Sequence, residues 1–394
     1  MPREPHGRVE LPVHPVRWLR TSHSWNRFQK NTTMGVAVNS TAACPPDLTG
    51  APRTLMHARK RPTVVDVASR AGVAVGTVSR VINHSEAVSP TTRDAVWRAI
   101  ADLGFRPNNV ARSMRTRVTR TIGFVVPDIS NPLFSVIARA AEGTLQNMGY
   151  LLNLANSGDS VEREVKLISD FAERQCDGLI FVTNNESDVR MIEALRTVRL
   201  PLVALDRDIN LHIDKVMTDH ARGMRLAVNY LLELGHRRVA LINASELIAP
   251  GRERLRGFRE AHAEFGLRVD ESLIRAGRLD QEFGATQLGA LLDLRRPPTA
   301  VIAGGNQILV GVLRALQLRE LTVPRDLSLI SCDDTAVTQV SSPPITVVDR
   351  DLAQIGRTAA QILIDRLSGQ SPSQVTRAFL PTELKIRASC TARR

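Results

Sequence analysis

The chain of 394 residues has few aromatic residues and no long apolar run. Phe, Trp and Tyr together make up 4% of it. No stretch of about 18 consecutive apolar residues occurs, the length that a membrane-spanning helix needs. Arg and Pro interrupt the N-terminal region throughout, so the apolar segment of a secretory signal peptide is missing as well. These absences predict a cytoplasmic protein that neither spans nor binds a membrane.

Cysteine is scarce too. The four residues, Cys44, Cys176, Cys332 and Cys390, form no CxxC pair and have no pair of histidines nearby. Zinc sites and disulfide frameworks show close or regular spacings, which this chain lacks. The pattern therefore predicts reduced thiols, with no metal site and no cofactor.

The motifs of common α/β enzymes are also missing. The chain has no GxGxxG after a strand-like run, no GxxxxGK[ST] and no GxSxG, and no His-containing catalytic set stands out. These absences predict a binding protein with no catalytic residues.

Acidic residues are in deficit only in the first third of the chain. Residues 1–120 contain 19 Lys and Arg against 7 Asp and Glu, whereas residues 121–394 contain 33 of each kind. The whole formal net charge of +12 therefore lies at the N-terminal end. This distribution predicts a polyanionic partner, with nucleic acid favoured over an anionic membrane surface.

Residues 1–60 show no helical or strand periodicity and are rich in Pro, Arg, Ser, Thr and Asn. We expect a disordered extension, or one that arises from too early a start codon. No function is predicted for it.

Three short helices are predicted next. Thr63, three residues before Asp66, has the spacing of a capping box, and Gly72 ends the first helix. The second helix runs from Ala74 to about Asn83. The third begins after an N-cap at Ser89, with Pro in its first turn, and ends at Gly104. Two helices joined by a short turn and braced by a third are typical of a helix-turn-helix domain, whose second helix enters the major groove of DNA.

From Thr121 the pattern changes to short apolar runs that alternate with amphipathic helices. The predicted strands are Thr121–Val126, Leu151–Ala155, Gly178–Val182, Leu202–Leu205, Val239–Asn243, Ala300–Ala303 and Leu327–Ser331. Predicted helices include Leu133–Met148, Val161–Arg174, Met224–Leu234 and Arg254–Glu264. Such alternation predicts parallel sheets covered on both faces, and its length favours two stacked α/β lobes. Polar residues follow the strands, where ligands of such sheets bind: Asp128, Asn184, Asp206, Asn306 and Asp333.

Several segments resemble the lactose-repressor family of transcriptional regulators. The segments that carry the resemblance are TVVDVASRAGVAVGTVSRVIN at 63–83, VSPTTRDAVWRAIADLGFRPNNVARSMR at 88–115, TIGFVVPDISNPLF at 121–134, DGLIF at 177–181, LGHRRVALI at 234–242, RLRGF at 254–258 and VPRDLSLISCDD at 323–334. The resemblance covers roughly residues 62–390 in order, and the first segment is highly specific.

The resemblance implies a fold and a function. The implied fold is a small all-α headpiece followed by two doubly wound parallel-sheet lobes like those of type I periplasmic binding proteins. The implied protein is a homodimer or a dimer of dimers that binds a near-palindromic DNA operator and responds to a sugar or related metabolite between the lobes. We expect it to be a repressor and its effector to be a sugar or sugar acid. The domain boundaries that we predict are an extension at 1–60, a headpiece at 61–106, a hinge helix and linker at 107–120, and the effector-binding and dimerisation core at 121–390.

The resemblance also implies which residues bind DNA, because positions of this chain match DNA-binding positions of the family. Val75, Gly76 and Arg80 match base-reading positions, and a guanidinium can bond guanine bidentately. Thr77, Ser79 and Asn83 match backbone contacts, and Met114 matches a residue that wedges into the minor groove. The full predicted set is Thr63, Val75, Gly76, Thr77, Ser79, Arg80, Asn83, Asn109, Ala111 and Met114. Family members often carry Tyr, Gln or Thr where this chain has Val75 and Gly76, so the operator sequence is not readable.

The resemblance implies the effector-binding residues in the same way, by matching positions of this chain to those of the family. Asp206, Arg254 and Asp333 match positions that hold the effector, and Phe134 matches an aromatic residue of the cleft. The full predicted set is Phe134, Asn184, Asp206, Arg254, Asn306 and Asp333. Asn306 stands where Asp is frequent, and Leu279 where sugar-binding members often have an aromatic residue. A non-sugar metabolite or a partner protein therefore remains an alternative effector. An α/β enzyme and an exported solute-binding protein remain alternative functions.

Overall fold

The computed structural model describes residues 62–82, 87–106, 118–174, 176–370 and 374–393. The N-terminal part of this range consists of three helices, α1 (Val64–Ala71), α2 (Val75–Ile82) and α3 (Pro90–Leu103). We call them the headpiece. All three helices start and stop within a residue or so of the predicted positions, and they lie inside the predicted domain at 61–106.

Local signals set these boundaries. The backbone N–H and the hydroxyl of Thr63 both donate to Asp66 Oδ2, at 2.7 and 2.8 Å, and Asp66 N–H donates back to the hydroxyl. Gly72 and Gly104 end α1 and α3 with φ values of +67° and +61°, which glycine adopts without a Cβ penalty. The headpiece core is made of small apolar side chains, and Val67, Val78 and Val96 are fully buried in it.

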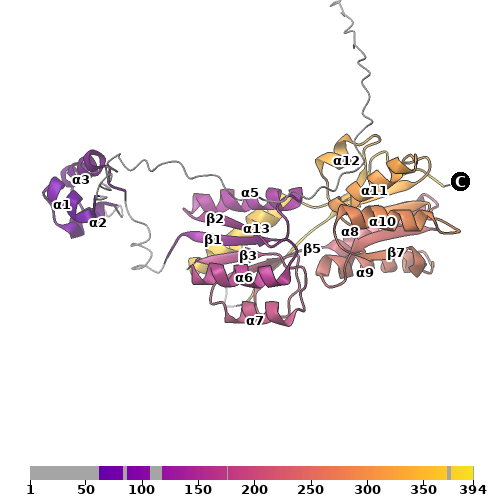
Figure 1. The fold of residues 1–394 in the computed structure, drawn as a ribbon, viewed down its shortest axis with the longest axis horizontal. Coiled ribbons are helices and arrows are strands. Elements are labelled where there is room, and N and C mark those ends of the chain that lie inside the picture. Colours follow the sequence, from indigo (N-terminus) through magenta and orange to yellow (C-terminus); the bar gives the residue numbers. More distant parts are fainter. Residues whose placement is uncertain (1–61, 83–86, 107–117, 175, 371–373, 394) are drawn as a thin grey trace, which may run out of the picture. The chain divides into compact units, whose positions relative to one another are not determined.

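Two six-stranded sheets form the rest of the described chain (Figure 1). The first has the order β11-β5-β4-β3-β1-β2 and is parallel throughout. Its strands are β1 (Thr121–Val126), β2 (Leu151–Asn156), β3 (Gly178–Phe181), β4 (Leu202–Leu205), β5 (Asp214–Thr218) and β11 (Arg377–Leu380). We call this sheet with its helices lobe 1.

Lobe 2 contains the second sheet, with the order β12-β10-β9-β8-β6-β7. Its strands are β6 (Val239–Ala244), β7 (Ile274–Gly277), β8 (Ala300–Ala303), β9 (Ser328–Cys332), β10 (Thr346–Asp349) and β12 (Glu383–Lys385). Only the edge strand β12 runs antiparallel, against β10. The predicted parallel sheets are therefore present, with one antiparallel edge that the sequence pattern did not indicate.

Helices cover both faces of each sheet. In lobe 1, α5 (Pro132–Asn147) and α13 (Leu352–Leu367) pack on one face, and α6 (Val161–Glu173) and α7 (Val189–Thr197) pack on the other. In lobe 2, the pairs are α8 (His220–Glu233) with α9 (Ala249–Glu264), and α10 (Gln281–Leu292) with α11 (Asn306–Leu318). The short helices η1 (Glu271–Leu273) and α12 (Ala336–Val340) complete lobe 2. No helix in the described ranges is long and apolar enough to cross a membrane.

The chain passes between the lobes three times. It crosses from β5 to α8, from β10 back to α13, and from β11 to β12. Two of these crossings touch, because Asp219 N–H donates to the carbonyl of Leu380 at 2.9 Å and Thr382 Oγ1 donates to the carbonyl of Asp219 at 2.9 Å. This path places the carboxyl ends of several strands from both sheets around one space.

Candidate functional site

A cleft of about 1040 Å³ lies between the two lobes. The six predicted effector residues all line it: Phe134, Asn184 and Asp206 from lobe 1, and Arg254, Asn306 and Asp333 from lobe 2. The structure thus brings together residues that are up to 199 positions apart in the sequence. Their role in effector binding remains a prediction.

The centre of the cleft is Arg350, a residue that the sequence did not single out. It lies on the crossing from β10 to α13, and its Nε donates to Asp333 Oδ1 at 2.7 Å. Its Nη1 donates to Asp206 Oδ2 and, at 3.3 Å, to Thr218 Oγ1. One guanidinium therefore ties a carboxylate at the end of a lobe 1 strand to a carboxylate at the end of a lobe 2 strand.

The two carboxylates occupy matching backbone positions. Asp206 follows β4 with φ +49°, and Asp333 follows β9 with φ +70°. The left-handed region is uncommon for residues with a Cβ and is found disproportionately at functional sites. Each N–H donates to the adjacent strand, Asp206 to the carbonyl of Val216 and Asp333 to that of Val348, both at 2.8 Å. These bonds hold both side chains over the cleft.

Burial and charge act in opposite directions on these groups. Burial alone would raise the pKa of Asp206, but Arg350, followed by His220 and Thr218, outweighs it and holds the pKa well below its usual range. Burial lowers the pKa of His220 to about 4, with the Arg254 and Arg350 cations adding to the effect and Asp206 opposing it. His220 is therefore neutral at pH 7, and its Nε2 lies 3.4 Å from Asp206 Oδ2 without hydrogen-bond geometry.

Arg254 projects from α9 into the lobe 2 side of the cleft. Only 4% of the residue is exposed, and its Nη1 donates to the carbonyl of Gly304 at 2.7 Å. Its buried Nε has no hydrogen-bond partner in the described part of the chain. The predicted trio is thus divided, because Asp206 and Asp333 pair with Arg350 and not with Arg254.

The remaining predicted residues lie on the walls. Asn306 Nδ2 donates to Asn131 Oδ1 at 3.0 Å, which joins the first residue of α11 to the N-cap of α5 across the cleft. Asn184 Nδ2 donates to Asp159 Oδ1 at 2.8 Å. Phe134 is partly buried against the lobe 1 core, and it is the one aromatic residue among the described residues that line the cleft.

A second contact joins the lobes at the start of α9. Glu186, in the loop after β3, accepts the N–H of Ala249 at 2.5 Å and the Nη2 of Arg252 at 2.5 Å. Ile248, the N-cap of α9, has no side chain able to cap the helix. Glu186 therefore supplies from lobe 1 the cap that lobe 2 lacks.

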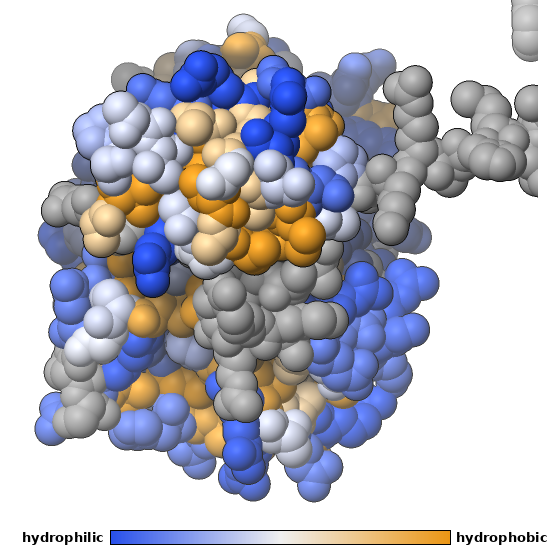
Figure 2. Space-filling view, turned by 90° about the vertical axis from the view of Figure 1, so that its left-hand side faces the viewer, coloured by the Kyte–Doolittle hydropathy of each residue, from blue (hydrophilic) through white to orange (hydrophobic). Residues whose placement is uncertain are grey.

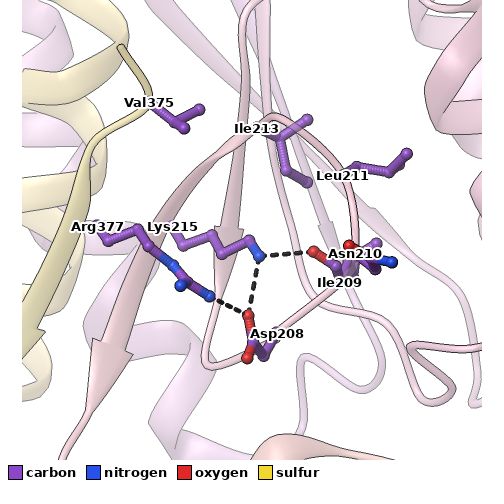
Figure 3. A pocket seen from close by; sticks show the side chains of 8 residues that line it. All are labelled: Asp208, Ile209, Asn210, Leu211, Ile213, Lys215, Val375 and Arg377. Carbon is purple, nitrogen blue, oxygen red and sulfur yellow. Dashed lines mark hydrogen bonds and ion pairs between the residues drawn. The ribbon is translucent and has the colours of Figure 1, made fainter.

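A separate pocket in lobe 1, of about 410 Å³, is lined in part by charged side chains (Figure 3). Lys215 Nζ donates to Asp208 Oδ1 at 2.9 Å and to the carbonyl of Ile209 at 2.6 Å, and Arg377 also pairs with Asp208. These charges satisfy one another, so the pocket gives no sign of a ligand. Among the described residues, no group of three or more His, Cys, Asp or Glu could hold a metal ion.

The predicted DNA-reading residues of the headpiece fall on α2. Val75, Gly76 and Arg80 are exposed, whereas Thr77 and Ser79 are partly buried. In Figure 2, apolar side chains gather on the face of the headpiece turned to the viewer, with hydrophilic ones at its border. Thr63 also has a structural role as the N-cap of α1. Asn83, Asn109, Ala111 and Met114 lie outside the described residues.

Together, a helix-turn-helix headpiece and a two-lobed α/β core with a ligand-sized cleft define a class of protein, the ligand-responsive DNA-binding regulators. Residues 63–108 match the model for bacterial regulatory proteins of the lacI family, and residues 228–390 match that for periplasmic binding protein-like domains. The chain is 34% identical to the HTH-type transcriptional regulator CelR of Thermobifida fusca over 342 residues. The matched region covers 85% of this chain and 100% of CelR. The chain belongs to the LacI family of transcriptional regulators, with a DNA-binding headpiece and an effector-binding core.

Other relatives agree. The HTH-type transcriptional repressor CytR of Escherichia coli K12 is 33% identical, over 86% of this chain and 99% of its own. The lac repressor dimer bound to operator and an anti-inducer superposes with a TM-score of 0.76 at 28% identity, over 84% of this chain and 100% of that chain. A CelR–cellobiose complex gives a TM-score of 0.65 at 33% identity, with the same coverage. These relatives are regulators and not enzymes.

Arg350, Glu186 and Asn131 are the residues that sequence reasoning missed. A signal for Arg350 was available, because it directly follows the short strand β10 (Thr346–Asp349), as Asp206 follows β4 and Asp333 follows β9. No local pattern marks Glu186 or Asn131, whose partners lie 63 and 175 positions away.

Proposed function

We propose that this protein is a cytoplasmic repressor that binds a near-palindromic operator as a homodimer, and that a sugar or sugar acid in the cleft changes its affinity for DNA. The observation that carries the proposal is the cleft itself, where carboxylates, guanidinium groups and amides from both lobes surround one space. Such groups form charge-assisted hydrogen bonds with the hydroxyl or carboxylate groups of a small polar molecule.

Three solved relatives support the kind of ligand and the assembly. CelR has been solved with cellobiose, and a LacI-family regulator of Enterococcus faecium with ribose, at 27% identity. The lac repressor has been solved as a dimer on its operator. A ligand that binds one arrangement of the lobes better than another would shift the population between them, and with it the affinity for DNA.

In the proposed complex, Arg80 reads a guanine from the major groove while Met114 enters the minor groove between two base steps. Replacing Arg80 by Ala should weaken operator binding by about 1–3 kcal/mol and relax the preference at one base pair of each half-site. Arg98→Ala, on the exposed surface of α3, is the matched control. An equal loss on all DNA sequences would instead make Arg80 a phosphate contact.

The experiment that tests the whole proposal has two stages. Operators are first selected from random DNA duplexes, and sugars and sugar acids are then screened for a thermal shift of the full chain. Ligands found in this way are retested for their effect on operator affinity. Binding that leaves operator affinity unchanged would contradict the proposed switch.

A further inference from the structure

We propose that Asp177 is a positioning residue for DNA binding. Its carboxylate holds Thr119 and Arg120 on lobe 1 and so fixes the point at which the predicted linker from the headpiece ends. The proposal rests on the proposed function, because it concerns how the core presents two headpieces to a near-palindromic operator. Three observations at the start of β1 carry it.

The first observation is the set of hydrogen bonds that this one carboxylate accepts. Asp177 Oδ1 accepts the N–H of Thr119 at 2.8 Å and its hydroxyl at 2.9 Å, and Oδ2 accepts the N–H of Arg120 at 2.8 Å. Hydrogen bonds to an ionised acceptor are roughly twice as strong as those between neutral groups. The register of β1 with β2 begins at Thr121, so the carboxylate holds two residues that precede the strand.

The second observation is the conformation of Arg120, whose φ of +54° lies in the left-handed region. Its Nη1 donates to the carbonyl of Met148 at the C-cap of α5, at 2.8 Å, and its Cζ lies 5.6 Å from the ring centroid of Tyr150. Its own carbonyl accepts the N–H of Leu151, the first residue of β2, at 2.9 Å. A residue with a Cβ persists in this region where its surroundings over-determine it. The end of the linker is therefore tied to α5 and β2 as well as to Asp177.

The third observation comes from lobe 2, where Thr299 occupies the position that Asp177 has in lobe 1. Thr299 precedes β8 and donates its N–H to the carbonyl of Arg238 at 2.9 Å, and Asp177 precedes β3 and donates its N–H to the carbonyl of Thr121 at 2.8 Å. The registers of β6 with β8 and of β1 with β3 each begin one residue later. The two positions are therefore equivalent, but only lobe 1 has a carboxylate there.

The chain enters the two sheets from different directions. In lobe 2, α8 leads directly to β6, and the N–H of His236 bonds to the carbonyl of Leu231 near the end of that helix at 3.0 Å. In lobe 1, β1 follows the predicted linker, and the N–H of Thr119, at the position equivalent to His236, bonds to Asp177. The carboxylate thus stands at the strand that the chain enters from the headpiece.

The held residues and the cleft lie at opposite ends of the same two strands. Thr119 and Asp177 precede β1 and β3, whereas Asp128 and Asn184, beyond the far ends of these strands, line the cleft. Both strands are buried along nearly all of their length, and buried, closely packed elements move as units. A movement of lobe 1 would therefore carry the end of the linker with it.

The test uses the isosteric variant Asp177→Asn in the full-length protein. An amide has one acceptor oxygen, so it cannot accept from both Thr119 and Arg120 as the carboxylate does. Residues freed in this way must be ordered again when both headpieces bind, and ordering the backbone of one residue costs a factor of about ten. By fluorescence anisotropy, affinity for a selected full operator should fall about tenfold or more, and affinity for a single half-site should not change. Glu173→Gln, which removes the same charge from an exposed position of α6, should change neither affinity.

Hydrogen exchange separates this role from a structural one. In Asp177→Asn the amides of Thr119 and Arg120 should exchange faster, while those of β1 and β3 keep their protection. Loss of protection throughout β1 and β3, or an equal loss of affinity for full operator and half-site, would overturn the proposal. Should Asp177→Asn fail to fold, Thr119→Val removes the hydroxyl bond alone and should give a smaller loss that is confined to the full operator. Wild-type affinity of Thr119→Val for the full operator would then overturn the proposal.

Failure of the proposal is distinguishable from failure of the proposed function. If Asp177→Asn released the two amides and yet bound the full operator as tightly as the wild type, the positioning role alone would be overturned. If the wild-type protein bound the full operator no more tightly than a half-site, the proposed homodimer on a near-palindromic operator would fail, and the role of Asp177 would fail with it.

Discussion

At the residue scale, one arginine decides the electrostatics of the cleft. Arg350 is half of each of two buried ion pairs, with Asp206 and with Asp333, and the two carboxylates belong to different lobes. Burial alone would lower the pKa of Arg350, but the two carboxylates outweigh it and raise the pKa above its usual range. The residue is therefore a fixed cation that pairs with one carboxylate of each lobe and so joins the lobes.

Removing that cation should be costly. Arg350→Met should lower the free energy of unfolding by about 3–5 kcal/mol, because it leaves two buried carboxylates unpaired. Urea unfolding followed by circular dichroism measures the change. Arg357→Met, on the exposed surface of α13, should change stability by no more than about 0.5 kcal/mol. Equal stability of the two variants would show that the ion pairs of Arg350 with Asp206 and Asp333 do not stabilise the fold.

His220 predicts how stability depends on pH. Its pKa is lowered from 6.5 to about 4 in the folded chain, chiefly by burial. Between these values the unfolded chain binds a proton that the folded chain does not, so stability falls as pH falls from 6.5 to 4. This group destabilises the folded chain by about 3 kcal/mol below pH 4, and it has no effect on stability above pH 6.5.

The measurement is the urea midpoint at a series of pH values. His220→Gln should flatten the curve between pH 6.5 and 4, although His236 and His262, whose pKa values burial also lowers, will leave a residual slope of the same sign. His212→Gln, at an exposed position, serves as the control. An unchanged slope in His220→Gln would show that the lowered pKa of His220 does not cause the pH dependence.

At the element scale, two glycines four positions apart in the headpiece should respond in opposite ways to the same substitution. Gly72 ends α1 with φ +67°, whereas Gly76 lies inside α2 with open space where a Cβ would be. Gly76→Ala should stabilise the headpiece by about 0.5–1 kcal/mol, and Gly72→Ala should destabilise it by about 1–2 kcal/mol.

Hydrogen exchange of the α1 and α2 amides in the full chain measures both effects. The added methyl of Gly76→Ala also lies on the predicted DNA-reading face, so operator selection should show altered preference despite the higher stability. Destabilisation by Gly76→Ala would mean that the fold itself requires this glycine.

The elements differ in how well the sequence predicted them. Caps and glycines placed α1 and α3 within a residue, because these signals act over three or four positions. Strands β5, β7, β10, β11 and β12 were not predicted. They are three to five residues long and carry charged residues such as Asp214, Lys215 and Arg377, so their apolar signal is weak.

At the scale of the whole molecule, two side-chain contacts join the lobes in addition to the ion pairs of Arg350. Asn131 meets Asn306, and Glu186 caps α9 and pairs with Arg252. Both contacts join a residue of lobe 1 to the start of a helix in lobe 2. We expect them to set how readily the lobes separate when no ligand is bound.

Glu186→Ala should therefore favour separation of the lobes. It removes two interlobe hydrogen bonds, and the N-terminus of α9 then lacks a cap. The radius of gyration of the ligand-free core, measured by small-angle X-ray scattering, should increase, and ligand affinity should fall because closure then costs more free energy. Glu193→Ala, at an exposed position of α7, should change neither quantity. An unchanged radius of gyration in Glu186→Ala would show that the Glu186 contact does not hold the lobes together.

The sequence by itself determined what depends on near neighbours. Helix caps, strand and helix periodicity and the polar residues after the strands depend on residues a few positions apart. The charge excess of the first 120 residues depends on composition alone. The tertiary structure alone decided which of these residues meet. Arg350 reaches Asp206 and Asp333 because the chain crosses between the lobes three times, and among the described residues both carboxylates pair with Arg350 and not with Arg254. Pairings over such sequence separations follow from the path of the chain, which no local pattern encodes.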